Sequence, residues 1–468
     1  MKVTNFSPYW DSIAALPMLL ALETQLRPAG AALGPGEVLF SLWLLPVIAA
    51  LIWRAQRLYS RQFMTLAAFW ATLAAALSLG VIVASVREIS VDWSLVIHDV
   101  AAYVLLALLT CVFTALPNAY DRLYRIQWMI ALLGAALFLM QLGNAYGLFS
   151  LAGIDPWYWD RMRGWSENPN QFALLCLLTG FAALALADRR NGVAAKLAAF
   201  TCSGIALWTG LQSKSNAYSA VVIAGILLLA LLKAVRAILK ADRTGAPATA
   251  LSLAGLSAIG LALTLSASVV DFRAEFQNAT GAIARKGEDE SADAALRLQL
   301  WEQSLSVGTH SWGLGLGPGP HLEIPPSIIA GRQGEDDPIN LTHPKPGLAP
   351  NFEAHNTILE LFVQGGVMAV AAFVAIVVLA ISRAWKSGHD GLIALLFALV
   401  AFGSFHVIFR HPFVWFAICL ALVSESHSRL LQPADSSDKA SPDSFTQRLD
   451  FPEAGRFRAR EALAVRRS

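Results

Sequence analysis

Long apolar blocks separated by short polar connections run through most of the chain. Blocks such as residues 63–86 and 216–239 are hydrophobic on every side, and they approach or exceed the roughly 20 residues that a helix needs to cross a bilayer. A soluble protein would alternate such blocks with amphipathic stripes. The pattern therefore predicts an all-α fold, a polytopic bundle of transmembrane helices.

The apolar blocks predict about twelve membrane spans. The connections after the even-numbered spans are rich in arginine and lysine, for example Arg57, Arg125 and Arg236, whereas the opposite connections are poor in them. By the positive-inside rule, this alternation predicts cytoplasmic termini and an outer position for one large loop, residues 271–354. The expected spans are residues 12–26, 36–53, 63–86, 93–116, 126–148, 170–187, 193–211, 216–239, 249–270, 357–382, 391–408 and 412–425.

This topology divides the chain into four parts. Residues 1–270 form the N-terminal transmembrane helices, 271–354 the large outer loop, and 355–425 the C-terminal transmembrane helices. Residues 426–468 are rich in Ser, Asp and Pro without apolar periodicity, which predicts a disordered cytoplasmic tail.

Composition agrees with a membrane protein and excludes some partners. The chain is 56% hydrophobic and 15% charged, against about 25% charged residues in soluble domains. Its net charge of +2 comes without a basic patch interleaved with aromatic residues, so no nucleic-acid partner is expected. The four cysteines lie inside apolar blocks without metal-ligand spacing, and no metal or cofactor is expected.

A histidine stands where the outer loop becomes the next apolar span. In "FEAHNTILELFVQGG", the positive end of the helix dipole disfavours the charged form of His355, which suits that side chain to accept a proton. Asn356 is placed to cap the helix or to orient the ring. An interfacial histidine without a role is the alternative interpretation.

Two outer cations are candidate anion-binding groups. Arg297 and Trp301 are four residues apart on one predicted helical face, and the glycine-rich run 313–319 follows. A flexible loop with a surface arginine is the alternative. Lys214 lies between two serines in a short outer turn, where it either binds a lipid phosphate or extends to the headgroups without a specific role.

Two further groups of residues leave structural and functional interpretations open. Tryptophans and a tyrosine surround Arg161 and Arg163 in "IDPWYWDRMRGW", as expected of a sugar-stacking surface or of an aromatic belt at the membrane interface. His98 and Asp99 lie inside a predicted span, where ionisable residues are functional candidates. A mutual hydrogen bond facing the bundle interior is the structural alternative.

In their order along the chain, these segments resemble the O-antigen ligase and O-antigen polymerase superfamily of bacterial membrane proteins. His355-Asn356 followed by Gly366 is similar to the family's His-Asn signature with its downstream glycine, although Ala369 stands at the usual second glycine-like position. The segment from Arg297 through "GLGLGPG" resembles the family's Arg–Trp–Gly-rich run, and "SENPNQFALL" resembles its Asn-Pro-Asn entry into a middle span.

One motif departs from the family pattern. "SKSNA" resembles the Ser-x-Ser-Arg turn, but Asn216 occupies the arginine position, and Lys214 is the candidate replacement for the missing cation.

The resemblance implies a metal-independent glycosyltransferase of the membrane-embedded GT-C kind in the bacterial inner membrane, with its large loop in the periplasm. The implied donor is an oligosaccharide on undecaprenyl diphosphate. The implied acceptor is a sugar hydroxyl on another lipid-linked glycan or on lipid A-core.

The chemistry of that transfer suits the candidate residues. His355 is the expected catalytic base, and Arg297 and Lys214 are expected to hold the donor diphosphate. Asn356, Gly366 and Arg163 are expected to support the site. A polymerase of capsular or exopolysaccharide is favoured over an O-antigen ligase, and a transporter or flippase for lipid-linked glycans is the alternative from a different class.

Overall fold

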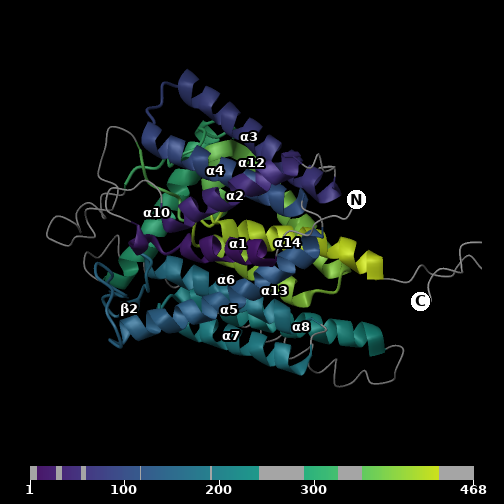
Figure 1. Ribbon diagram of the computed structural model, residues 1–468. Helices are drawn as coiled ribbons and strands as arrows, with labels where there is room; N and C mark the ends of the chain where they lie inside the picture. Colours follow the sequence, from purple (N-terminus) through teal and green to yellow (C-terminus); the bar gives the residue numbers. More distant parts are fainter. Residues whose placement is uncertain are drawn as a thin grey trace, which may run out of the picture. The chain divides into compact units, whose positions relative to one another are not determined.

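A computed structural model describes residues 8–27, 34–53, 60–115, 118–189, 192–241, 289–324 and 350–431, which are mostly helical. The described residues up to His427 belong to one compact unit, which contains all of the site described below. The helices are α1 (Pro8–Leu20), η1 (Thr24–Leu26), α2 (Pro35–Trp53), α3 (Arg61–Val86), α4 (Trp93–Ala115), α5 (Ala119–Ala145), α6 (Pro169–Ala187), α7 (Val193–Leu211), α8 (Asn216–Ala241), α10 (Asp289–His310), α12 (Thr357–Lys386), α13 (Asp390–Gly403) and α14 (Pro412–Leu431) (Figure 1).

Seven of the described helices are long and apolar enough to cross a membrane, namely α3 to α8 and α12. The predicted spans 36–53, 391–408 and 412–425 correspond to α2, α13 and α14, whose apolar parts are shorter, and the predicted first span overlaps the short helix α1. The predicted span 249–270 lies outside the described residues. The mostly helical fold and its membrane-spanning helices are therefore as predicted, whereas the count of about twelve spans stays a prediction.

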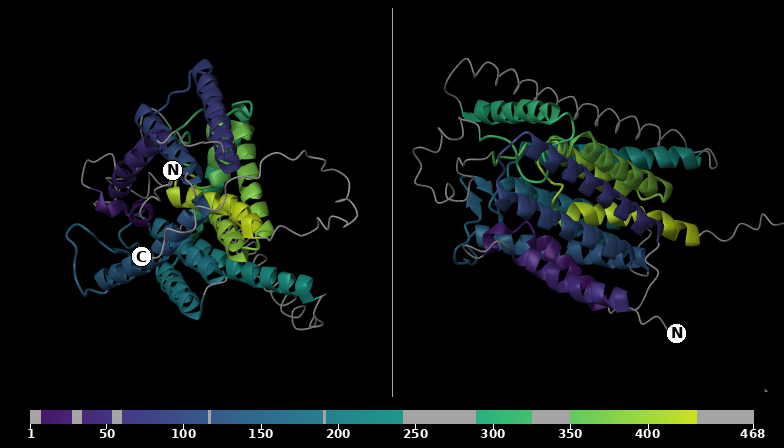
Figure 2. Two further views of the ribbon diagram at one scale, coloured as in Figure 1. Left: turned by 45° about the vertical axis from the view of Figure 1, so that its right-hand side comes forward. Right: turned by 90° about the horizontal axis from the view of Figure 1, so that it is seen from above.

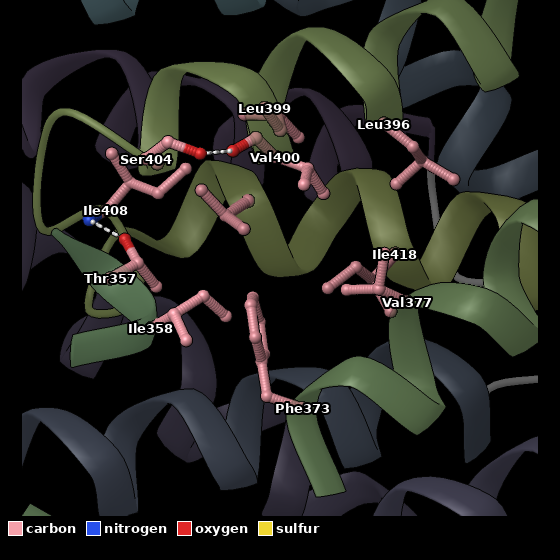
Figure 3. Close-up of a pocket in the computed structure, with 12 residues that line it drawn as sticks. Thr357, Ile358, Phe373, Val377, Leu396, Leu399, Val400, Ser404, Ile408 and Ile418 are labelled. Carbon is pink, nitrogen blue, oxygen red and sulfur yellow. Dashed lines mark hydrogen bonds between the residues drawn. The ribbon is translucent and has the colours of Figure 1, made fainter. Parts of the chain in front are cut away.

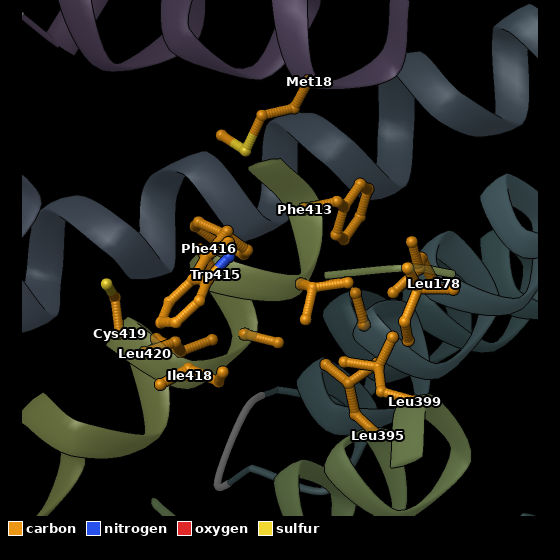
Figure 4. Packing of buried hydrophobic residues seen from close by; sticks show 14 of the residues in the cluster. Met18, Leu178, Leu395, Leu399, Phe413, Trp415, Phe416, Ile418, Cys419 and Leu420 are labelled. Atoms are coloured by element: carbon orange, nitrogen blue, oxygen red, sulfur yellow. The ribbon is translucent and has the colours of Figure 1, made fainter. Parts of the chain in front are cut away.

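Helices that are apolar on every side lie in two different environments in this bundle. Every residue of α14 from Phe413 to Val423 is buried by protein, and the side chains in Figure 4 pack there against residues of α1, α6 and α13. The apolar part of α6 is 83% buried, but that of α8 only 28%. Helices α6 and α14 therefore form the protein core, while the exposed apolar faces of helices such as α8 suit contact with lipid.

Neighbouring helices come from distant parts of the chain. Helix α1 packs on α2 and α5, α13 packs on α6 and α8, and α12 packs on α3, α10 and α13. The right-hand view of Figure 2 shows most of these helices running in roughly similar directions. One end of the bundle, here called the loop end, contains the described parts of the connections before α2, α4, α6, α8, α12 and α14.

Hydrogen bonds fasten the connections of the loop end to one another. Gln25 Nε2 donates to the Asp155 carbonyl at 3.0 Å, and Arg161 Nε donates to the Ser213 carbonyl at 3.0 Å. A two-stranded hairpin, β1 (Trp157–Tyr158) with β2 (Arg161–Met162), carries that arginine. The loop end is therefore a connected layer that can hold side chains in fixed positions.

Candidate active site

The helix that follows His355 is broken at Gly366, where φ is 63° and ψ is −160°. In an unbroken helix the Val367 N–H would donate to the Val363 carbonyl. Here Val367 N–H donates to the Gly313 carbonyl at 2.9 Å, and the Val363 carbonyl accepts from Leu316 N–H at 2.8 Å. The glycine-rich run is thus hydrogen-bonded into the break in α12 and is not the flexible loop considered as the alternative.

Glycine is required where the glycine-rich run crosses α3 and α12, because the main chains are in direct contact there. A Cβ atom at Gly366 would overlap the Gly313 carbonyl oxygen, and a Cβ atom at Gly80 of α3 would overlap the backbone nitrogen of Gly317. The positive φ of Gly366 also favours glycine. Gly366, a predicted supporting residue, therefore lies at the junction of α3, the glycine-rich run and α12.

His355 lies directly before the first turn of α12 and is half-buried. Its backbone has a positive φ of 49°, and its ring meets the Phe352 ring edge-on with centroids 5.4 Å apart. Asn356 Oδ1 caps α12 by accepting from Ile358 N–H at 2.9 Å and Leu359 N–H at 3.1 Å. The cap holds the short segment that carries His355 in a conformation that non-glycine residues seldom adopt.

A second histidine, His406, lies in the connection between α13 and α14. Its backbone carbonyl accepts from Thr357 Oγ1 at 2.7 Å, and its ring stacks on Phe402 with centroids 4.6 Å apart. Among the described residues, its Nε2 atom is buried and has no hydrogen-bond partner. His406 is therefore held beside the start of α12, and one of its ring nitrogens is buried without a hydrogen-bond partner among the described residues.

Two arginines and His355, which come from three other segments, act electrostatically on the His406 ring. Burial is the largest cause that lowers the pKa of His406 to about 3, and Arg297, His355, Arg161 and His411 contribute to the same shift. The shared influence places these three side chains in one electrostatic neighbourhood around a neutral imidazole. Such a neighbourhood favours an anion.

The two arginines reach this neighbourhood from different elements. Arg297 is half-buried on α10, which packs against α12. Arg161 on β2 donates to the Ser213 carbonyl and, at 3.4 Å, to Asn170 Oδ1. Two planar guanidinium groups provide paired donors suited to a diphosphate, because each can contact two oxygens at once.

The other two predicted cations are engaged by acids. Lys214 Nζ lies 2.6 Å from Asp160 Oδ2, and both side chains are largely exposed. That hydrogen bond lowers the pKa of Asp160. Arg163 is buried and bonds Asp155 through Oδ2 at 3.0 Å and through the backbone carbonyl at 2.9 Å. Lys214 therefore lies at the rim of the loop end, and Arg163 braces the hairpin that presents Arg161.

A buried polar network lies behind His355. Arg410 forms ion pairs with Asp99 of α4 and with Glu353, two residues before His355. Asp99 Oδ2 also accepts from the Gly319 N–H at 3.2 Å. His98, predicted to bond Asp99, lies 3.7 Å from it and is more than half exposed. The principal partner of Asp99 is therefore Arg410, which ties α4 to the segment before His355.

The same network continues into the first turns of α12. Gln364 Nε2 donates to Glu360 Oε1 at 2.8 Å and to Asp99 Oδ2 at 3.2 Å, while Gln364 Oε1 accepts from the Tyr103 hydroxyl at 2.5 Å. Glu360 Oε2 accepts from the Ala354 N–H at 2.8 Å. The backbone on the N-terminal side of His355 is therefore held from within the bundle.

Sequence reasoning named Arg297, His355 and Asn356 but missed His406 and the role of Arg410. No motif surrounds His406 or Arg410, and the available signal was their place in a connection that the charge pattern predicts to lie on the same side as the large loop. Arg161 was noticed only with its neighbour Arg163, since their different partners are decided by tertiary contacts.

Comparison with known families gives one match. Residues 172–374 match the family model described as O-antigen ligase. The matched segment runs from α6 into α12 and contains Lys214, Arg297, His355 and Gly366, while Arg161 and His406 lie outside it. A search of curated proteins finds no match.

Proposed function

We propose that this chain, whose residues 172–374 match the O-antigen ligase family model, belongs to the O-antigen ligase and polymerase superfamily and transfers glycan from an undecaprenyl-diphosphate-linked donor to a sugar hydroxyl. The observation that carries the proposal is that the segments bearing His355 and His406 are hydrogen-bonded together at one end of the bundle, through Asn356 to the Ser404 carbonyl and through Thr357 to the His406 carbonyl. The charges of Arg297 and Arg161 also act on His406 there. Two arginines beside a histidine provide the groups that such a transfer needs: fixed positive charge for the leaving diphosphate and a base for the acceptor.

The proposed reaction is one displacement at the anomeric carbon. The acceptor oxygen forms the new glycosidic bond while the bond between the anomeric carbon and the diphosphate breaks. His355 takes the acceptor proton, and undecaprenyl diphosphate leaves with the bonding electrons. Arg161 and Arg297 stabilise the charge that develops on the leaving diphosphate, so the step is proposed to need no metal ion.

His406 is assigned a different task from His355. A histidine that stays neutral among cations is a poor base, but its N–H can donate a hydrogen bond to a phosphate or leaving oxygen. We assign that donation to Nε2, the ring atom without a partner among the described residues.

The loop end is proposed to face the periplasm, with the bundle in the inner membrane. In support, basic residues gather at the opposite end, including Arg61 at the start of α3 and Arg383 and Lys386 at the end of α12. This distribution follows the positive-inside rule. A polyprenyl tail would then stay in the bilayer while its glycan reaches water at the loop end.

The acceptor is proposed to be another lipid-linked glycan, which makes the protein a polymerase of capsular or exopolysaccharide rather than a ligase to lipid A-core. The test uses purified full-length protein in lipid nanodiscs with a lipid-linked oligosaccharide donor, a metal chelator and either acceptor. Longer lipid-linked products would support polymerisation, and glycosylated lipid A-core would identify a ligase. Lipid movement across reconstituted vesicles without a new glycosidic bond would contradict both and favour a transporter.

A further inference from the structure

A polar cavity lies at the loop end, apart from the candidate active site. Its volume is about 220 Å³, and it is bounded by the end of α3, the second half of α10, the segment after the glycine-rich run and the connection before α12. Pockets for drug-sized ligands measure roughly 300–1,000 Å³, so this cavity suits a single ring. Most of the side chains that line it are polar, namely Arg87, Gln303, His310, Ser311, His321 and Glu323.

Helix α10 forms one continuous wall of this cavity. Gln303, Val307 and His310 line it and are spaced four and three residues apart, so they share one face of the helix. Arg297 precedes these residues on the same helix, by about 9 Å for Gln303 and about 20 Å for His310 at the helical rise of 1.5 Å per residue. The cavity is therefore separate from Arg297 but aligned with it along α10.

A short extended segment forms another wall. Leu322 pairs with Phe352 through two backbone hydrogen bonds of 3.1 and 2.9 Å. The Leu322 side chain is fully buried among hydrophobic residues, whereas its neighbours His321 and Glu323 line the cavity, as expected of alternate sides of an extended chain. The Phe352 ring in turn meets the His355 ring. The pairing therefore connects the wall of the cavity to the segment that carries His355.

His321 offers a hydrogen-bond acceptor at this wall. Its side chain is 6% exposed, and Nε2 donates to the Gly317 carbonyl at 2.9 Å. Burial lowers the pKa of His321, so the ring is neutral and its proton is on Nε2. No other hydrogen bond joins the ring to a residue in the described part of the chain. Nδ1 can therefore accept a hydrogen bond from a ligand that has an O–H or N–H group.

Arg87 and Glu323 bring opposite charges to the same cavity. The guanidinium carbon of Arg87 lies 4.6 Å from the centroid of the Trp312 ring, a cation–π contact that restricts the side chain. Within the described segments, Arg87 and Glu323 form no ion pair with each other. Gln303 adds an amide that both donates and accepts. The lining therefore combines fixed donors and acceptors instead of charges of a single sign.

A sugar ring is the ligand whose chemistry matches this lining. Each sugar hydroxyl both donates and accepts, so neighbouring hydroxyls can bond Arg87, Glu323 and His321 together. A phosphate only accepts, so Glu323 would repel it and the Nδ1 atom of His321 would stay unpaired. An apolar group would leave the buried imidazole without a partner.

The apolar pocket between α12, α13 and α14 is a poorer place for a sugar. Figure 3 shows its lining, in which Thr357 and Ser404 are the only described residues with polar side chains. Thr357 Oγ1 already accepts from the Ile408 N–H at 3.0 Å and donates to the His406 carbonyl. The polar cavity beside α10 is therefore the better match for a carbohydrate.

We propose that this cavity is a second glycan-binding subsite, which holds one sugar ring of a long glycan at a distance from the bond formed at His355. This inference rests on the proposed function and adds a control of product length. A glycan of several sugars can occupy both the catalytic end and the cavity, whereas one repeat unit cannot. Holding the chain at two points raises its effective concentration at His355, so chains should grow longer before release.

The first test measures binding without chemistry. Full-length protein in nanodiscs is titrated by calorimetry with water-soluble oligosaccharides of one and of four repeat units, released from the lipid-linked donor. The longer glycan should bind at least tenfold more tightly, because it alone reaches both positions. Inorganic phosphate should not displace it from the cavity. Equal affinity for the two lengths would overturn the proposal, as would displacement by phosphate.

A matched pair of variants makes the result specific to the cavity. Gln303→Trp should fill the cavity and remove the tenfold advantage of the longer glycan. Leu305→Trp places the same side chain on the same helix, at a residue that is 50% exposed and outside the cavity, so it should bind like the wild type. Equal binding by both variants would overturn the proposal.

A smaller substitution keeps the test decisive if Gln303→Trp does not fold. Glu323 is exposed, so Glu323→Ala removes a charged acceptor with little effect on packing. It should weaken binding of the four-repeat glycan about tenfold while leaving that of the single repeat unchanged. Unchanged binding of the longer glycan by Glu323→Ala would overturn the proposal.

Product length separates this inference from the proposed function. With the lipid-linked donor, Gln303→Trp should make shorter chains than Leu305→Trp, while the rate of transfer to a single-repeat acceptor stays near wild type. Chains of wild-type length from Gln303→Trp would refute the subsite and keep the transferase. Length-dependent binding by a protein that forms no glycosidic bond would refute the transferase and keep the subsite.

Discussion

Asn356 Nδ2 donates a hydrogen bond to the Ser404 carbonyl at 2.8 Å, which joins the segment of His355 to the connection that carries His406. The same side chain accepts two backbone N–H groups at the start of α12. One amide therefore fixes both the helix end and the spacing of the two histidine segments.

Asn356→Ala should impair both stability and turnover. Loss of the cap should cost about 1 kcal/mol of unfolding free energy, and freeing the His355 segment should lower kcat about tenfold or more, because small misplacements of a catalytic group are costly. Asn356→Asp can still cap α12 but cannot donate to Ser404, so it should regain stability without regaining turnover. Thermal unfolding and steady-state transfer measure the two effects, and equal recovery of both would show that only the cap matters.

Gly366→Ala should prevent correct assembly of the loop end. The added Cβ would overlap the Gly313 carbonyl at a positive φ, and together these effects should cost several kcal/mol or displace the glycine-rich run. Gly204→Ala is the matched control, because nothing lies within 4 Å of its added Cβ on α7. The fraction of monodisperse protein after extraction and its unfolding temperature should fall only for Gly366→Ala. A similar result for both variants would contradict the crossing described here.

Acid should destabilise the fold partly through His406 and His411, whose pKa values burial lowers to about 3 and about 4, with neighbouring positive charges adding to both shifts. Both are neutral in the folded protein at pH 5, whereas the unfolded chain binds protons below about pH 6.5. Their contribution is complete above pH 6.5 and is lost as pH falls toward 4. His406→Gln should therefore reduce the drop in unfolding temperature between pH 7.5 and 5, and His310→Gln, at an exposed position, should not. An unchanged drop in His406→Gln would contradict the buried neutral ring.

Arg161 and Lys214 should differ in their effect on donor use. Arg161→Lys and Arg297→Lys keep the positive charge but lose the paired N–H donors of the planar guanidinium group. Each should therefore raise the KM for the lipid-linked donor about tenfold. Lys214→Ala should change KM less, because Asp160 already neutralises an ammonium group that is exposed at the rim. Donor titrations with the purified variants measure the difference. A larger effect at Lys214 than at Arg161 would indicate that the diphosphate binds at the turn before α8.

The helices were predictable where hydrophobicity alone decides the structure. Helix α6 (Pro169–Ala187) nearly coincides with the predicted span 170–187, since an all-round apolar run needs no tertiary information. Helix α5 begins at Ala119 rather than at residue 126, because hydrogen bonding continues through Arg122 and Arg125 where hydropathy stops. Arg122 is itself buried, which its charge did not indicate.

The candidate site was predictable only where residues lie beside a recognisable boundary. His355 marks the start of an apolar span, and Arg297 precedes a glycine-rich run, so both were singled out. Arg410 and His406 depend on contacts with Asp99, Glu353 and Thr357 that are far away in sequence. Periodicity and hydropathy contain no information about such contacts, and the roles proposed for these side chains stay predictions.

The most direct measurement is glycan transfer by purified His355→Gln with a defined lipid-linked donor, compared with His98→Gln, a histidine at the same end that is more than half exposed. Glutamine keeps hydrogen bonding but cannot accept a proton at neutral pH. Loss of the base should lower kcat about 10²- to 10⁴-fold while donor binding and unfolding temperature stay near wild type, and His98→Gln should remain active. Near-normal turnover by a folded His355→Gln would contradict the account, because the acceptor proton would then not pass through His355.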